Sequence, residues 1–155
     1  MKNFPVKIGD AVEVSKTIAE SDVYLFAGIT GDFSPNHVNE ELMRNSPYKH
    51  RIVHGALIVG FMSTASSTLI AKFGSARSDR LPVSLGYDRI RFIEPVFIGD
   101  TLKVAYEITA VDEARCRSTA DIIVTNQIGK NVAVAQHVLK WVATAENKPN
   151  RAASQ

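Results

Sequence analysis

The sequence has a single cysteine, Cys116, and this scarcity excludes several kinds of protein. One thiol cannot form an intramolecular disulfide, a paired-cysteine redox motif or a multi-cysteine zinc site. An isolated cysteine is typical of a reducing compartment, and residues 1–10 contain no apolar run of the kind found in secretory signals. We therefore expect a cytoplasmic protein.

A strong charge of either sign is also absent. The 155 residues include 18 Lys and Arg against 16 Asp and Glu, which gives a formal net charge of +2. This charge is too small to favour binding to nucleic acid or to an anionic membrane, and we expect neither partner. The most apolar stretch, residues 52–71, includes His54 and several Ser and Thr side chains, which favours a buried helix over a membrane span.

No repeat and no linker divides the chain, so we expect a single domain over residues 1–144. With 155 residues, 45% of them hydrophobic, the protein can bury a core without disulfides or metals. Residues 145–155 are polar and show no periodicity, which predicts a flexible C-terminal tail.

The hydrophobic patterns and their boundary residues predict the order of the elements. In the first half they predict a strand at 11–19, a helix from Ser21 (N-cap) and Asp22 (first-turn acid) to Ile29, a helix capped by Asn39 that ends near residue 45, and a long helix from Gly55 to Phe73. Gly and Pro residues indicate a loop over 30–35. In the second half, two-residue alternation predicts strands at 82–93, 101–111, 116–126 and 132–143.

The long helix is apolar or small on nearly every side, so we expect the protein to cover most of it. Together with the strands it predicts an α+β domain in which a curved antiparallel sheet wraps around a long central helix. Such a sheet has open edges, which a second subunit often closes. We therefore expect a homodimer or a dimer-based homo-oligomer.

The segment FAGITGDFSPNH, residues 26–37, places an acid and an imidazole on one loop. A tight loop can direct Asp32 and His37 at one point, where they would hold a water molecule and move protons near neutral pH. The residues alone leave an alternative open, in which Asp32 caps a turn and His37 is a satisfied polar side chain.

The segment RIVHG, residues 51–55, starts the long helix. The N–H of Gly55 lies at the positive end of the helix dipole, where it would stabilise a carbonyl oxygen that gains negative charge. Alternatively, the glycine only lets the helix begin close to the sheet. His50 and His54 have a spacing that can bind a metal on one helix face, but they straddle the helix start and lack a third ligand, so we expect no metal site.

These segments, followed by YDRIRFIEPVFIGDTL at residues 87–102, resemble the MaoC-like dehydratases, and specifically the (R)-specific enoyl-CoA hydratases. The resemblance runs from about residue 8 to residue 142. It implies a hot-dog fold, dimers with active sites near the subunit interface, and an acyl-CoA thioester substrate. The implied reaction adds water to a trans-2-enoyl-CoA to give the (R)-3-hydroxyacyl-CoA, or runs in reverse, without a metal or redox cofactor. By motif, Asp32 and His37 would be the catalytic pair, the Gly55 N–H would donate to the thioester oxygen, and Ser63 would line the site.

The sequence departs from the family in the catalytic loop. Ser34 stands where the family usually has Asn, which predicts a less firmly oriented His37. Asn36 replaces an aliphatic residue and indicates a more polar acyl group, unless it faces solvent. Arg51, with Lys49, would bind the phosphates of CoA or a substrate carboxylate; a solvated basic loop is the alternative.

Two other functions stay open. A hot-dog acyl-CoA thioesterase would need a carboxylate that directs water at the thioester carbon, whereas the spacing of Asp32 and His37 and the following His54-Gly55 favour the hydratase. A non-catalytic acyl-CoA-binding subunit is disfavoured because both Asp32 and His37 are present, although Ser34 and Asn36 keep it open.

Overall fold

The centre of the molecule is a five-stranded antiparallel sheet with the strand order β1-β3-β4-β5-β2. The computed structural model describes residues 4–74 and 79–144, so the predicted tail at 145–155 lies outside the described residues. The strands are β1 (Ala11–Thr17), β2 (Arg80–Phe92), β3 (Thr101–Asp112), β4 (Arg117–Thr125) and β5 (Asn131–Ala143).

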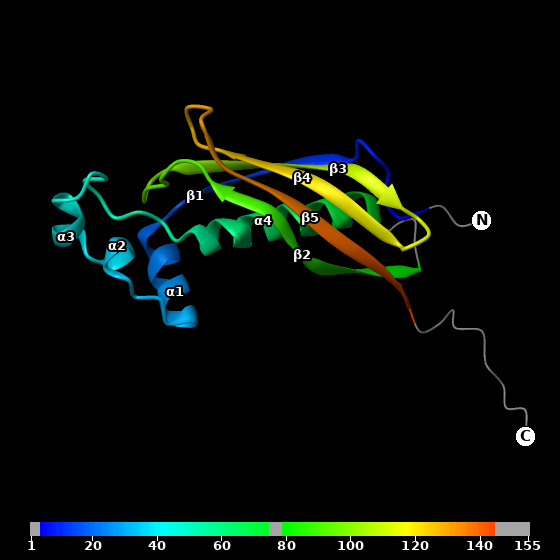
Figure 1. Cartoon of the computed structure of the whole chain (residues 1–155), viewed down its shortest axis with the longest axis horizontal. Helices are drawn as coiled ribbons and strands as arrows, with labels where there is room; N and C mark the ends of the chain where they lie inside the picture. The colour runs from blue at the N-terminus through cyan, green and yellow to red at the C-terminus, as the bar shows by residue number, and fades with distance from the viewer. Residues whose placement is uncertain (1–3, 75–78, 145–155) are drawn as a thin grey trace, which may run out of the picture.

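One long helix lies along a face of the curved sheet, and three short helices project beyond one end of the sheet (Figure 1). The long helix is α4 (Gly55–Leu69), which continues into a π-helical turn, η1 (Ile70–Gly74). The short helices are α1 (Glu20–Thr30), α2 (Pro35–Val38) and α3 (Glu40–Arg44). This arrangement confirms the predicted α+β hot-dog fold.

Alternation along the strands explains why the sheet has one apolar face. Val104, Tyr106 and Ile108 on β3 are at most 1% exposed, and the β4 residues Ala120 and Ile122 lie beside them. The sheet-facing side of α4 repeats at helical spacing through Ile58, Met62, Ala65 and Leu69, all buried. Burying each large apolar side chain contributes about 1.5–3 kcal/mol, so this layer holds the helix on the sheet.

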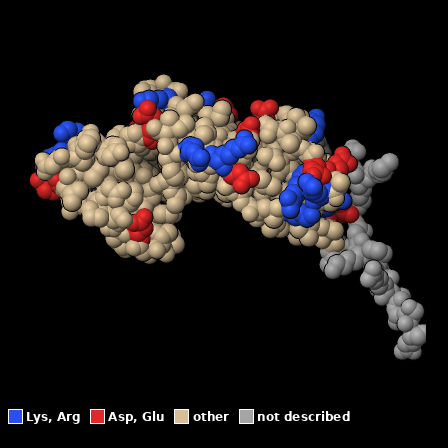
Figure 2. Space-filling model, in the orientation of Figure 1, with Lys and Arg blue, Asp and Glu red and all other residues tan. Residues whose placement is uncertain are grey.

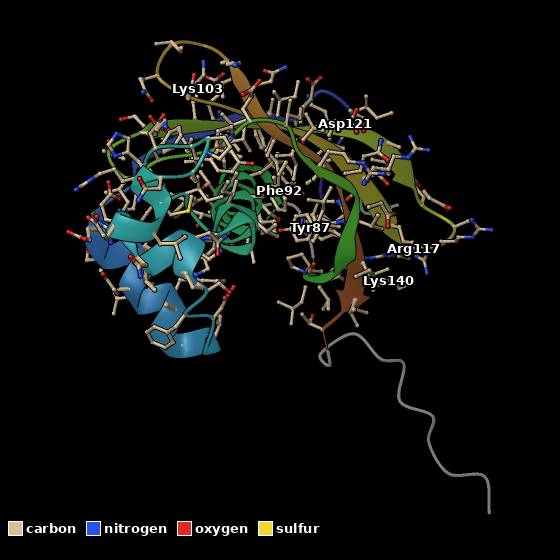
Figure 3. The ribbon with its side chains drawn as sticks, turned by 60° about the vertical axis from the view of Figure 1, so that its left-hand side comes forward. Tyr87, Phe92, Lys103, Arg117, Asp121 and Lys140 are labelled. Atoms are coloured by element: carbon tan, nitrogen blue, oxygen red, sulfur yellow. The ribbon has the colours of Figure 1, made fainter. Side chains whose placement is uncertain are left out.

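The opposite face of the sheet carries charged side chains, among them Lys103, Arg117 and Asp121 (Figure 3). Figure 2 shows Lys and Arg intermixed with Asp and Glu on the face in view, in keeping with the small net charge. This face of the sheet therefore carries an ordinary solvent-exposed mixture of positive and negative side chains.

Within one chain α4 is covered on one side only, so the prediction that it is covered on most sides is wrong for the single subunit. Because the exposed residues on its uncovered side are small or hydroxyl-bearing and uncharged, the sequence alone did not distinguish this side from a buried one. These residues include Ala56, Gly60, Ser63, Thr64 and Ser67. By length and composition the stretch Gly55–Gly74 is apolar enough to cross a membrane. In the fold, its large apolar side chains pack against the sheet.

The helix boundaries differ from prediction near the loop at 30–35. The N-cap of α1 is Ala19, not Ser21, and the Asp22 carboxylate accepts a hydrogen bond from the Ala19 N–H at 2.8 Å. The predicted loop ends in the four-residue helix α2, which begins at Pro35, a residue suited to a first helical turn because it lacks an N–H. The cap at Asn39 is confirmed, since its Oδ1 accepts from the Leu42 N–H at 2.9 Å.

Candidate active site

Asp32 lies in the turn between α1 and α2 with its side chain exposed. Its Oδ1 accepts hydrogen bonds from the Ser34 hydroxyl at 2.6 Å and from the Ser34 N–H at 3.2 Å. These bonds lower the pKa of the Asp32 carboxyl below its usual value, and the nearby His37 and His54 rings lower it further. Asp32 does cap its turn, and it also presents an ionised carboxylate to its neighbours.

His37 lies on α2 and is only 9% exposed. Its Nδ1 is 2.8 Å from the carbonyl oxygen of Ile52. Because a carbonyl oxygen can only accept, Nδ1 carries the hydrogen of the neutral ring, and the lone pair of Nε2 can accept a hydrogen bond. The Asn36 amide donates to Nε2 at 3.2 Å. The ring is therefore held at both nitrogens, with its basic Nε2 beside the Asn36 amide.

His54 belongs to this site, although the sequence analysis did not assign it a role. It is 2% exposed and stacks on the His37 ring, with centroids 3.7 Å apart. Its Nε2 is 3.0 Å from the Asp32 carbonyl oxygen and 4.0 Å from the carboxylate Oδ2. His54 therefore fixes the Asp32 turn against the His37 ring. His50 lies apart and pairs with Glu40 at 2.8 Å, so the two histidines do not form a metal-binding pair.

Gly55 is the first residue of α4, where an N–H has no acceptor within the helix and lies at the positive end of the helix dipole. A Cβ at this position would lie 2.6 Å from the ring of Phe92. Figure 3 shows Phe92 on the side of β2 that faces α4. The glycine thus allows a close approach to the sheet, and its N–H is available to a ligand carbonyl.

His37 and Gly55 line one pocket of about 270 Å³. This is just below the usual range of ligand sites, about 300–1,000 Å³, so within one chain it suits the reacting end of a larger molecule. Its wall is mostly apolar and comes from the segment before α4, from α4, from the end of β2 and from the loop after β2: Tyr48, Ile52, Val53, Ile58, Phe92, Ile93, Glu94, Pro95 and Val96.

The other predicted site residues divide into two groups. Ser34 and Asn36 contact the predicted catalytic pair, with Ser34 bonded to Asp32 and Asn36 bonded to His37. Ser63 lies two helical turns beyond Gly55, where its hydroxyl partly offsets the rise in the pKa of Tyr87 that burial causes. The Arg51 guanidinium is held by the carboxylates of Glu20 and Glu40. Of the predicted site residues, only His37 and Gly55 line the pocket, and the contacts of the others with substrate remain predictions.

One ligand atom from each of Asp32, His37 and His54 lies within 4.8 Å of the other two, a set that in principle could hold a metal ion. The tautomer of His54 argues against it. Its Nε2–H is committed to the Asp32 carbonyl, while its Nδ1 is buried with no partner among the described residues. Binding a metal through Nε2 would move the hydrogen to a buried Nδ1 that has no acceptor, which is unfavourable.

Comparison with known proteins agrees with this geometry. An (R)-specific enoyl-CoA hydratase of Rhodospirillum rubrum is 36% identical over 106 residues, 68% of each chain. A 3-hydroxybutyryl-CoA dehydratase of Methylorubrum extorquens is 29% identical over 141 residues, 91% of this chain and 83% of the relative. The solved (R)-hydratase of Aeromonas caviae, involved in PHA biosynthesis, superimposes with a TM-score of 0.77 at 25% identity, covering 87% of this chain and 96% of that one. The sequence profile of the MaoC like domain matches residues 4–132, and the chain belongs to this family.

Proposed function

We propose that this protein is an (R)-specific enoyl-CoA hydratase, or in reverse a 3-hydroxyacyl-CoA dehydratase. The observation that carries the proposal is the position of His37, which lies beside the ionised Asp32 and lines the same pocket as Gly55 at the N-terminus of α4. The similar proteins of R. rubrum and M. extorquens are named for these two directions of one reaction. The chain is accordingly a hydro-lyase acting on CoA thioesters.

The residues divide the reaction between them. Asp32 and His37 hold one water molecule, and one of the pair accepts a proton from it as the water oxygen bonds to C3 of the enoyl group. The electron pair of the double bond moves toward the thioester oxygen, where the Gly55 N–H and the helix dipole stabilise the negative charge. A proton then passes from the pair to C2, which completes the addition of one water and restores both residues.

We further propose a homodimer formed through β2. This strand ends the sheet, and its apolar side chains Leu81, Val83 and Leu85 are about half exposed or more, at 60%, 48% and 50%. An open strand edge with exposed apolar residues favours pairing with another chain. Pairing there would cover the uncovered side of α4 and extend the pocket beside Phe92. Light scattering should give a dimer for the wild type and a smaller mass for Leu85→Lys.

The function is tested with crotonyl-CoA as substrate. We expect the absorbance of the enoyl thioester to fall and chiral analysis of the product to give the (R)-3-hydroxy isomer. Release of free thiol in the same cuvette would support the thioesterase instead. Binding of the thioester without turnover of crotonyl-CoA or longer enoyl-CoA substrates would support the non-catalytic subunit.

A further inference from the structure

The proposed catalytic groups come from two parts of the fold. Asp32 and His37 belong to the part formed by α1, α2 and α3, which projects beyond the sheet (Figure 1). Gly55 begins α4, which packs on the sheet. Addition of water at C3 with charge developing on the thioester oxygen requires these groups in a fixed relation, because misplacement by about 1 Å can reduce a rate about 100-fold.

Residues 51–55, which we term the linking segment, join the two parts. The Ile52 N–H donates to the Asn36 carbonyl at 3.0 Å, and the Ile52 carbonyl accepts from His37 Nδ1 at 2.8 Å. On its other side, the Val53 N–H donates to the Val96 carbonyl at 2.7 Å. The orientation of the His37 ring therefore depends on where the backbone of the linking segment lies.

Arg51 fastens the start of this segment to two of the projecting helices. Its Nη2 donates to Glu20 Oε1 at 2.6 Å, at the start of α1, and its Nε donates to Glu40 Oε2 at 3.3 Å, at the start of α3. The Arg51 backbone N–H donates to the same Glu40 oxygen at 3.1 Å. A further bond runs from Nη1 to the Tyr24 hydroxyl at 3.2 Å.

These contacts differ from an ordinary surface ion pair. The Arg51 side chain is only 14% exposed, although its partners Glu20 and Glu40 are 57% and 38% exposed, so water screens the guanidinium itself less than a fully exposed one. The planar guanidinium donates in three directions at once, a geometry that a lysine ammonium reproduces only in part. Glu40 is engaged as well: its bonds to His50 and to the Arg51 N–H lower the pKa of its carboxyl.

We propose that Arg51 is a positioning residue, which holds the linking segment against α1 and α3 so that His37 and Asp32 face the N–H of Gly55. In this role the guanidinium binds two carboxylates of the chain itself, whereas the sequence suggests a contact with CoA phosphates or a substrate carboxylate. For its effect on catalysis the inference rests on the proposed hydratase function; for its geometry it does not.

Steady-state hydration of crotonyl-CoA by matched variants tests the catalytic effect. We expect kcat of Arg51→Ala to fall about 10- to 100-fold with KM nearly unchanged, and Arg51→Lys to recover part of the loss. Arg44→Ala is the control, because Arg44 makes an exposed ion pair with Glu41 on the same helix α3. Its kcat should match the wild type. A rise in KM with kcat preserved in Arg51→Ala would overturn the proposal and restore the phosphate contact.

A second measurement reports the geometry even if the wild type does not hydrate the substrate. NMR of the ¹⁵N-labelled protein should show a protected Nδ1–H proton of His37, identified by its loss in His37→Ala. We expect Arg51→Ala to broaden or remove this signal through exchange with water, while Arg44→Ala keeps it and thermal unfolding shows both variants folded. An unchanged signal in folded Arg51→Ala would refute the positioning role, whatever the enzyme activity.

Discussion

Two buried histidines on this chain have both ring nitrogens bonded, yet their surroundings differ. His137 on β5 is 2% exposed, with Nδ1 2.9 Å from the Tyr106 hydroxyl and Nε2 2.8 Å from the Ser84 hydroxyl. The Tyr87 ring stacks on it with centroids 4.1 Å apart. Burial lowers the pKa of His137 to about 4, so the ring stays neutral near pH 7.

His37 is buried to a similar degree but lies beside an ionised carboxylate and lines a pocket. Hydroxyl groups can satisfy a neutral ring without exchanging protons at neutral pH, whereas a carboxylate partner and an open pocket let a ring take up and return a proton. Burial and full hydrogen bonding therefore do not separate a structural histidine from a catalytic one. What separates the two kinds of histidine is the chemical nature of the hydrogen-bonding or charged partner and whether the substrate can reach the ring.

The largest expected effect tests this separation directly. His37→Ala and Asp32→Asn should each lower kcat for crotonyl-CoA by about 100- to 10,000-fold, since each removes one member of the proton-transferring pair. His137→Gln should keep kcat within a few-fold of the wild type. Circular dichroism confirms that each variant is folded. Comparable loss of kcat in folded His137→Gln would erase the distinction between the two sites.

The sequence predicts the fold of this molecule better than it predicts the site. Alternation such as that of Val104, Tyr106 and Ile108 reports which face is buried, so the strands are predicted within a few residues. His54 was weighed only as a metal partner of His50, a pairing already disfavoured because the two straddle the helix start. Its contact with the Asp32 carbonyl, 22 residues away, depends on the tertiary fold.

Arg51 shows more generally that the sequence does not reveal contacts between residues far apart in the chain. Its carboxylate partners, Glu20 and Glu40, lie 31 and 11 residues away in the sequence, and only the tertiary fold brings them together. A basic residue that looks free in the sequence is therefore paired in the structure. The short helix α2 was missed for a related reason, because four residues that begin with Pro35 carry no periodicity to detect.

The next largest effect concerns stability in acid. The pKa of His137 is about 4 in the folded protein against 6.5 for the free group, so the unfolded chain binds more protons between these values. Stability from this residue is complete above about pH 6.5, falls as the pH drops from 6.5 toward 4, and levels off below pH 4 after a loss of about 3 kcal/mol. Urea unfolding at several pH values should show a flatter dependence for His137→Gln than for the wild type. Parallel curves for the two proteins would mean that burial does not suppress protonation of His137.

A smaller effect is expected at the pocket wall. Gly55→Ala keeps the N–H but places a methyl group against the Phe92 ring, which must shift within the pocket. We expect kcat/KM to fall about tenfold. Gly28→Ala is the control, because Gly28 lies within the helix α1 and a Cβ there meets nothing within 4 Å. If the clash causes the loss, the double variant Gly55→Ala/Phe92→Ala should recover part of kcat/KM. No recovery would mean that the change disturbs the start of the helix rather than the Phe92 ring.

The smallest effect separates the roles of the two members of the pair. The Ser34 hydroxyl is the main cause of the lowered pKa of Asp32, so Ser34→Ala should move that pKa back toward its ordinary value. A carboxylate with a raised pKa becomes protonated at higher pH, so the acid limb of kcat/KM should move to higher pH while the rate near pH 7.5 stays nearly constant. Ser34→Asn, which keeps a donor, should restore the wild-type limb. An acid limb that does not move in Ser34→Ala would mean that ionisation of Asp32 does not control the reaction, and the proton-accepting role would then fall to His37 alone.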